Sequence, residues 1–193
     1  PFLELKPHYF MSLEIIPAQK KHASASAELI LDAMEELIYF YLGEENKPEA
    51  LRFLTDQFLL EDSLYSYKHT QIPILRGKIV GVLIAYDSSK HQRLQQILKN
   101  YLEENYNFKD DLTPETEAGE FYVDTISINP SFRGQKIGSE LLKHAEKLAL
   151  KQKHSQIGLL VDLENPNAKR LYERIGYQVV KPISLGKHAY EHL

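Results

Sequence analysis

The sequence predicts an α/β fold in which a mixed, mostly antiparallel sheet is flanked by helices. In the first half, two amphipathic helical segments precede two strand-like runs that a short glycine-containing turn joins as a hairpin. In the second half, strand and helix patterns alternate, which is typical of a parallel strand pair with a right-handed crossover. The length of 193 residues suits one domain, which we expect over residues 11–193.

The elements of the first half are indicated by hydrophobic spacing and by turn residues. Gly43 ends one helical pattern, and Pro48 opens the next at a position where its missing N–H costs nothing. Pro73 indicates either a bulge or an N–H position that faces away from a ladder partner. The predicted elements are a strand over residues 12–17, a helix over residues 23–42, a helix from Pro48, and strands over residues 65–75 and 79–86.

The remaining elements follow the same reasoning. Residues 89–102 predict a polar helix, and the acidic stretch 103–120 predicts a surface insertion without a motif. Gly176 is a natural helix stop. After the insertion we expect a strand over 120–128, a helix over 136–152, a strand over 156–161, a helix over 167–175, and short strands over 177–180 and 188–192.

Composition and charge exclude several classes of protein. With 43% hydrophobic and 26% charged residues, the chain is neither disordered nor fibrous. It has no cysteine, so disulfides, thiolate metal sites and a cysteine nucleophile are excluded. The 23 basic and 27 acidic residues give a net charge of −4, which argues against a dedicated nucleic-acid binder.

Targeting signals are not apparent in the sequence. The longest apolar run, residues 79–86, has strand length and falls far short of the ~20 residues that a membrane-spanning helix needs. The first residues have neither a basic nor an apolar signal-peptide region. We therefore expect a cytoplasmic protein without a membrane partner, in which residues 1–10 are an N-terminal arm or of non-native origin.

A glycine-containing turn at residues 129–139 predicts an anion site. It stands between a strand and an amphipathic helix, where unpaired N–H groups and the helix dipole attract phosphate. Gly134 and Gly138 leave the backbone uncovered, while Arg133 and Lys136 add positive charge. The spacing fits neither a nucleotide P-loop nor a dinucleotide-binding motif. Alone, the turn is equally compatible with an ordinary strand-to-helix connection.

A second segment, residues 161–177, supports the interpretation of this turn as an anion site. Together the two segments resemble the GNAT family of acyl-CoA-dependent N-acetyltransferases. Arg133 to Gly138 resembles the family's pyrophosphate turn, with Lys136 in the place of its usual first glycine. The second segment is similar to the family's Asn-x-x-Ala-x-x-Leu-Tyr-x-x-x-Gly-aromatic motif, matched here by Asn165, Ala168, Leu171, Tyr172, Gly176 and Tyr177.

The resemblance implies a GNAT-like acyl-CoA N-acyltransferase fold, in which the parallel pair formed by the family's fourth and fifth strands splays apart. It implies acetyl-CoA as co-substrate, held in that gap, and direct acetyl transfer to a primary amine. The N–H of Ile128 would face the thioester oxygen. The implied cofactor-binding residues are Ile126, Ser127, Ile128, Arg133, Gly134, Gln135, Lys136, Ile137, Gly138, Ser139, Asn165, Ala168 and Tyr172.

Two residues are candidates for proton transfer. The matched motif makes Tyr172 the candidate general acid for the departing thiolate, since its phenol is protonated at neutral pH. Periodicity alone favours a core tyrosine at this position. Asp124 is the candidate base, expected on the same strand face as Ile126 and Ile128. Glu120 and Tyr122 share that predicted face and are alternatives, and water is another.

The acceptor is left open by the sequence: a small-molecule amine and a peptide or protein amine both fit. His188 and His192 favour an exposed strand or a pocket wall over a metal site, which needs more ligands. The acidic cluster of Glu35, Glu36, Glu44 and Glu45 is either a solvated face or a feature that favours a cationic acceptor. A homodimer is compatible with the exposed strand edges. The alternative function is a catalytically silent acyl-CoA-binding module.

Overall fold

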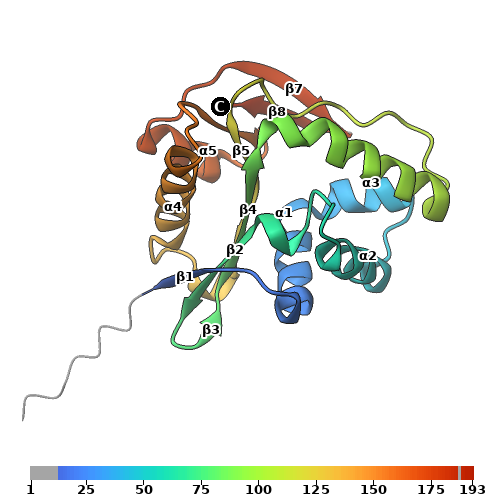
Figure 1. Ribbon diagram of the computed structural model, residues 1–193, viewed down its shortest axis with the longest axis horizontal. Helices are drawn as coiled ribbons and strands as arrows, with labels where there is room; N and C mark the ends of the chain where they lie inside the picture. The colour runs from blue at the N-terminus through green and yellow to red at the C-terminus, as the bar shows by residue number, and fades with distance from the viewer. Residues whose placement is uncertain (1–12, 187) are drawn as a thin grey trace, which may run out of the picture.

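The computed structural model describes residues 13–186 and 188–193, so the predicted arm at residues 1–10 lies outside the described residues (Figure 1). The strands are β1 (Glu14–Pro17), β2 (Thr70–Leu75), β3 (Lys78–Ile79), β4 (Gly81–Asp87), β5 (Phe121–Ile128), β6 (Ile157–Asp162), β7 (Lys181–Leu185) and β8 (His188–His192). The α-helices are α1 (Ala23–Leu42), α2 (Lys47–Leu59), α3 (His91–Tyr106), α4 (Ile137–Lys151) and α5 (Pro166–Ile175).

One mixed sheet runs through the molecule, and helices cover both of its faces (Figure 1). The strand order is β1-β2-β4-β5-β6-β8-β7, with β3 paired to β2. The helices α1, α2 and α3 pack on one face around Phe53 and Phe58, while α4 and α5 pack on the other around Leu141 and Leu142. The predicted fold class is confirmed. Within the described residues, no helix is long and apolar enough to cross a membrane.

Helix α1 has the predicted bounds but is kinked in its middle. It ends at Gly43, whose φ of 75° favours a residue without a Cβ. Met34 departs from helical geometry, with φ −143° and ψ 35°. Periodicity did not predict this kink, because the apolar spacing continues on both sides of it. The kink places the middle of α1 beside the end of the sheet where the functional site lies.

The predicted hairpin is confirmed, with a break that Pro73 explains. Arg76 and Gly77 form a two-residue turn with φ values of 54° and 71°. Because Pro73 has no N–H to donate, the ladder is interrupted there, and Val80 N donates to Pro73 O at 3.0 Å between β3 and β4. Strand β2, the first strand of this hairpin, was predicted to begin at residue 65 but begins at Thr70.

Most elements of the second half match the prediction, but the strand expected over residues 177–180 is absent. After Gly176, with φ 119°, the ring of Tyr177 is buried against α5, which holds the chain away from the sheet. Val180 N makes the first bond to β8, at 2.8 Å to His192 O, and regular pairing starts with β7. The strand therefore starts at Lys181 instead of Tyr177.

The parallel strands β5 and β6 separate halfway along their length. Their pairing covers only Phe121 to Val123 on β5 and Ile157 to Leu159 on β6. From Leu160 onward β6 pairs with β8, while the rest of β5 stays paired with β4 on its other edge. A gap in the sheet results, as the family resemblance implies.

Candidate active site

A cavity of about 780 Å³ occupies the gap between β5 and β6. Its walls come from α1, β5, the turn before α4, the start of α4, β6 and α5. Most of the predicted cofactor-binding residues line it. They are Ile126, Ser127, Ile128, Arg133, Gly134, Lys136, Ile137, Gly138, Ser139, Asn165, Ala168 and Tyr172; Gln135 is not among the lining residues.

The turn before α4 has the open backbone that an anion site requires. Gly134 has a φ of 78°, and a Cβ placed on it would meet no atom within 4 Å. A Cβ on Gly138 would meet only Leu171 Cδ2, at 3.5 Å. Lys136 also lies in the left-handed region, with φ 63°, which explains why glycine is the usual residue at this position in the resembled motif. The ammonium group of Lys136 therefore adds positive charge at a residue whose backbone is strained.

Tyr172 packs in the core and also lines the cavity. Asn165 starts α5 because its side chain accepts a hydrogen bond from Ala168 N at 3.1 Å. Two turns later, Tyr172 is only 7% exposed and packs against Tyr177, yet it lines the cavity. Burial raises the pKa of Tyr172 to about 12. Its hydroxyl therefore carries a proton at every physiological pH.

Asp124 lines the cavity, but it does not share a face with Ile126 and Ile128 as the alternation predicts. Opposite β4, the pairing passes from Thr125 directly to Val123, so Asp124 is the extra residue of a β-bulge. The bulge reverses the alternation. Asp124 therefore points to the α1 face of the sheet, where it bonds Tyr86, whereas Ile126 and Ile128 pack on the α4 face.

Asp124 is held by two hydroxyl donors and has an altered acidity. Tyr86 donates to its Oδ2 at 2.6 Å, and Thr125 Oγ1 donates to its Oδ1 at 2.9 Å. Burial raises the pKa of Asp124 to about 6, although both hydrogen bonds lower it. Tyr86 also lies 3.1 Å from Nδ1 of His91, whose pKa burial lowers to about 4. A carboxylate with a pKa near the working pH is suited to accept a proton.

The sequence missed Glu115, which belongs to the stretch predicted as a surface insertion. That prediction is wrong for Glu115 and Glu120, both of which are buried. Glu115 lines the cavity and accepts a hydrogen bond from Tyr122 at 3.0 Å. Burial, followed by the charge of Asp124, raises the pKa of Glu115 to about 8. No spacing in the acidic stretch separates buried Glu115 from half-exposed Glu117, so the local sequence carries no signal for the burial of Glu115.

Glu120, the alternative base, lies outside the cavity. Its Oε1 accepts a hydrogen bond from Glu117 N at 2.8 Å and lies 3.2 Å from His192 Nε2. His192 is buried in this contact, on the other side of β6 from the cavity's carboxylates. Tyr122 does line the cavity, but its hydroxyl is engaged with Glu115.

Of the other predicted acidic and histidine residues, His188 and Glu36 lie next to a residue of the cavity. His188 contacts Glu36, and its Nδ1 is 3.7 Å from Asp162, a cavity residue. Glu35 instead accepts a hydrogen bond from Tyr39, and Glu44 one from Asn46. Among the described residues, no group of three or more His, Asp or Glu side chains is arranged to hold a metal ion.

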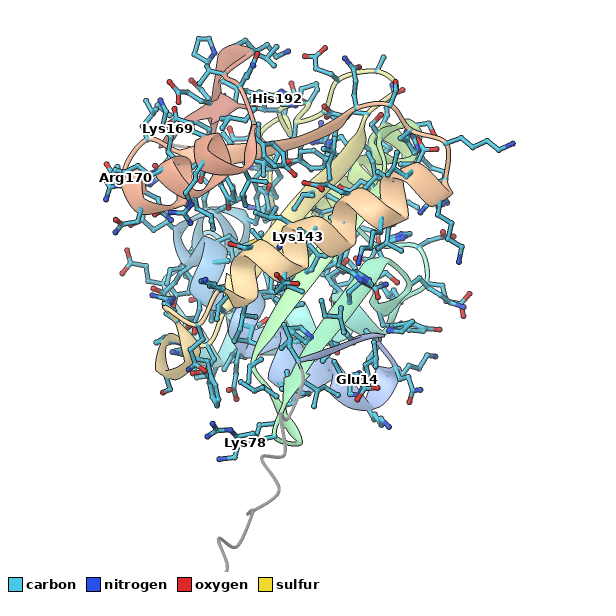
Figure 2. All side chains as sticks on the ribbon, turned by 90° about the vertical axis from the view of Figure 1, so that its left-hand side faces the viewer. Glu14, Lys78, Lys143, Lys169, Arg170 and His192 are labelled. Atoms are coloured by element: carbon cyan, nitrogen blue, oxygen red, sulfur yellow. The ribbon has the colours of Figure 1, made fainter. Side chains whose placement is uncertain are left out.

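The charges that line the cavity are sorted by sign. Four basic residues, Arg133, Lys136, Arg170 and Arg174, come from the turn and from α5; Figure 2 shows Arg170 on that helix. Four acidic residues, Asp32, Glu115, Asp124 and Asp162, come from α1, β5, β6 and the segment before β5. Arg170 and Arg174 were not predicted as site residues, although their spacing of four places them on one side of a helix. The cavity thus has a basic end and an acidic end.

The burial of Glu115 predicts a stability that declines with rising pH. An unfolded chain holds this carboxyl near its ordinary pKa of 4.5, so the folded protein binds an extra proton between about pH 4.5 and 8. The free energy of unfolding must fall across that window. We expect Glu115→Gln to raise Tm by several degrees at pH 8.5 and by little at pH 4.5, measured by calorimetry.

Glu117→Gln is the matched control, because Glu117 lies two residues away and pairs with Lys181 at the surface. It should leave the pH dependence of Tm as in the wild type. A Glu115→Gln variant that melts below the wild type at pH 8.5 would contradict the assignment of this carboxyl as a buried, destabilising charge.

Comparison with known proteins agrees with this geometry. The model of the acetyltransferase (GNAT) family matches residues 31–177. A curated acetyltransferase of Agrobacterium fabrum is 35% identical over 79 residues, which are 39% of this chain and 56% of the relative; the match thus spans about half of that relative's length.

Two solved structures share the fold. An N-acetyltransferase from Staphylococcus aureus Mu50 is 20% identical with a TM-score of 0.79, covering 93% of this chain and 98% of that one. The PaiA N-acetyltransferase from Thermoplasma acidophilum, in complex with coenzyme A, is 14% identical with a TM-score of 0.57, covering 94% and 97%.

Proposed function

The chain belongs to the GNAT acetyltransferase family, and from this premise we propose that it transfers the acetyl group of acetyl-CoA to a primary amine. The observation that carries the proposal is the cavity in the β5–β6 gap, which joins a phosphate-type turn to a buried tyrosine and a buried carboxylate. An acyl-CoA has the matching shape, since it is a long molecule with phosphates at one end and a thioester at the other.

The free edge of β5 supports the placement of the pantetheine arm. Asn129 N donates to Val80 O on the β4 side at 3.0 Å. Because successive N–H groups of a strand point to opposite edges, the N–H of Ile128 points away from β4 and into the gap. It can hydrogen-bond an amide or the thioester oxygen there. Ile128 O likewise faces away from β4 and accepts from Arg133 Nε at 3.1 Å.

The basic end of the cavity is the site we assign to the phosphates. The amides of Ile137, Gly138 and Ser139 begin α4 and line the cavity, where a helix N-terminus favours an anion. Arg170 and Arg174 add charge from α5. These two arginines extend the implied cofactor-binding set.

The chemistry divides between Asp124 and Tyr172. The amine nitrogen attacks the thioester carbon, and Asp124 takes the proton that the nitrogen loses. The N–H of Ile128 stabilises the negative charge that develops on the carbonyl oxygen. The carbon–sulfur bond then breaks, and Tyr172 gives its proton to the departing sulfur. Coenzyme A leaves as a thiol, and the acetyl group remains on the acceptor as an amide.

Acetyl-CoA turnover tests the proposal directly. Calorimetric titration should give binding of CoA, and free thiol should appear when acetyl-CoA and a panel of primary amines are supplied together. Binding of CoA with no thiol release for any amine would favour the silent acyl-CoA-binding module. Absence of CoA binding would reject both functions.

Substitutions of Lys136 can separate the effect of its charge on CoA binding from the effect of its backbone strain on stability. We expect Lys136→Ala and Lys136→Gly each to weaken CoA binding by roughly threefold, since both remove one charge from a helix N-terminus. Lys136→Gly should also raise the free energy of unfolding above that of Lys136→Ala, because glycine tolerates the φ of 63°. Calorimetric titration and thermal unfolding give the two readouts. Tighter CoA binding in Lys136→Ala would contradict a supporting role for the charge.

A further inference from the structure

The acidic end of the cavity contains two carboxylates, Glu115 and Asp124, surrounded by tyrosines. Tyr65, Tyr122 and Tyr190 line the cavity beside them. The structure therefore encloses two acidic groups in an aromatic wall, at the end of the cavity away from the basic turn. The carboxylate of Glu115 is not needed there for packing, because a glutamine could accept the same hydrogen bond from the hydroxyl of Tyr122.

Within residues 13–186 and 188–193, neither carboxylate forms an ion pair. Glu117, two residues from Glu115, instead forms an ion pair with Lys181. Glu115 Oε2 accepts a hydrogen bond from the hydroxyl of Tyr122. Among the described residues, no donor forms a hydrogen bond with Glu115 Oε1. A buried carboxylate without a counter-ion is costly, and a cation bound in the cavity would offset that cost.

Two further features of this end favour a positive charge. The kink at Met34 ends the first segment of α1, and Asp32, Ala33 and Met34 line the cavity there. The carbonyl groups at a helix end carry partial negative charge. The rings of Tyr65, Tyr122 and Tyr190 are also suitable partners for an ammonium group, because aromatic faces attract cations.

Glu115 and Asp124 lie close enough for the charge of Asp124 to act on Glu115. Glu115 is bound to Tyr122, which precedes Asp124 by two residues and is therefore farther from the turn before α4. Two residues of strand span about 6.5 Å. A short alkyl chain would therefore suffice to place one ammonium group at each carboxylate.

We propose that Glu115 recognises a second ammonium group on the acceptor, so that the preferred acceptors are diamines or polyamines with a short alkyl spacer. This inference rests on the proposed function for the identity of the reacting amine, which Asp124 meets. The distal ammonium donates to Glu115 Oε1 and replaces the missing counter-ion.

Binding of such a cation must release a proton. Burial raises the pKa of both carboxyls, so the empty site holds a proton near neutral pH that an ammonium group displaces. In the described part of the chain, the titratable groups that interact with the pair are neutral tyrosines: Tyr41 of α1, Tyr65 before β2, Tyr86 of β4, Tyr122 of β5 and Tyr190 of β8. We expect the affinity for a diamine to rise from pH 6 to pH 8.

Calorimetric titration of the CoA-saturated protein tests the inference without turnover. The probes are 1,5-diaminopentane and 1-aminopentane, which differ by one ammonium group. At pH 8 we expect the diamine to bind roughly 10- to 100-fold more tightly, as one charged hydrogen bond predicts. Glu115→Gln should reduce this preference to within about threefold. It should lower the affinity for the diamine far more than that for 1-aminopentane, while Glu117→Gln behaves as the wild type.

The outcomes separate this inference from the proposed function. Equal binding of the two probes by the wild type, or a preference that survives in Glu115→Gln, overturns the diamine site even if monoamines are acetylated. Preferential binding of the diamine without any thiol release from acetyl-CoA would keep the cation site and reject the transferase. The wild-type comparison decides the question by itself if Glu115→Gln does not fold.

Discussion

Replacing Tyr172 by phenylalanine is expected to lower kcat for acetyl transfer roughly 10²-fold, with little change in the binding of acetyl-CoA. The ring that packs against Tyr177 remains, so the wall of the cavity keeps its shape. What disappears is the proton for the departing thiolate. Because burial raises the pKa of Tyr172 to about 12, the wild-type hydroxyl should stay protonated, and active, well into the alkaline range. Initial rates of thiol release across pH 6–9.5 measure both effects.

Tyr177→Phe is the matched control for this experiment. The two rings lie 6.0 Å apart, and both are buried, but Tyr177 does not line the main cavity. Loss of its hydroxyl should leave kcat unchanged within about twofold, since it touches no reacting atom. Turnover of Tyr172→Phe within a few-fold of the wild type, with Tyr177→Phe behaving identically, would assign Tyr172 to packing alone.

The parts of the fold that the sequence predicted are those set by local pattern. Helix α1 has the expected bounds because its apolar spacing and Gly43 both act within a few residues. The turn at Arg76 and Gly77 and the start of α5 at Asn165 are also local. The cofactor half of the site belongs to this class, since the turn and the α5 segment carry recognisable motifs.

The acceptor half depends on contacts between distant segments, and there the predictions were incomplete. The face predicted for Asp124 was wrong because the bulge depends on how β5 pairs with β4. The β4 residue that Asp124 contacts, Tyr86, is 38 residues away in the sequence. Glu115 was missed because its burial depends on the path of a loop across Tyr122 and Tyr190. A strand pattern assumes unbroken alternation, and a run of acidic residues suggests solvent. Both assumptions fail at this cavity.

Asp124→Asn is expected to lower kcat/KM for the amine by about 10²-fold or more, and to remove one limb of its pH profile. A base must be ionised to accept a proton, so wild-type activity should fall as the pH drops through the pKa of Asp124, about 6. Asparagine keeps the size of the side chain and one acceptor oxygen, but it cannot titrate. The remaining activity of the variant should therefore not fall as the pH drops through about 6. Rates at subsaturating amine between pH 5 and 9 provide the profile.

Tyr86→Phe distinguishes a catalytic Asp124 from one that only holds the bulge. The hydroxyl of Tyr86 donates to the carboxylate at 2.6 Å and stabilises its charged form. Its removal should raise the pKa of Asp124, and the acid limb should move up by about one pH unit. Thr125→Val should cause a smaller shift in the same direction, since its bond is longer, at 2.9 Å. A structural role predicts lower stability in these variants with the limb unmoved. If neither variant shifts the limb and Asp124→Asn retains it, the proton leaves through water, and Asp124 serves the acceptor only through its charge.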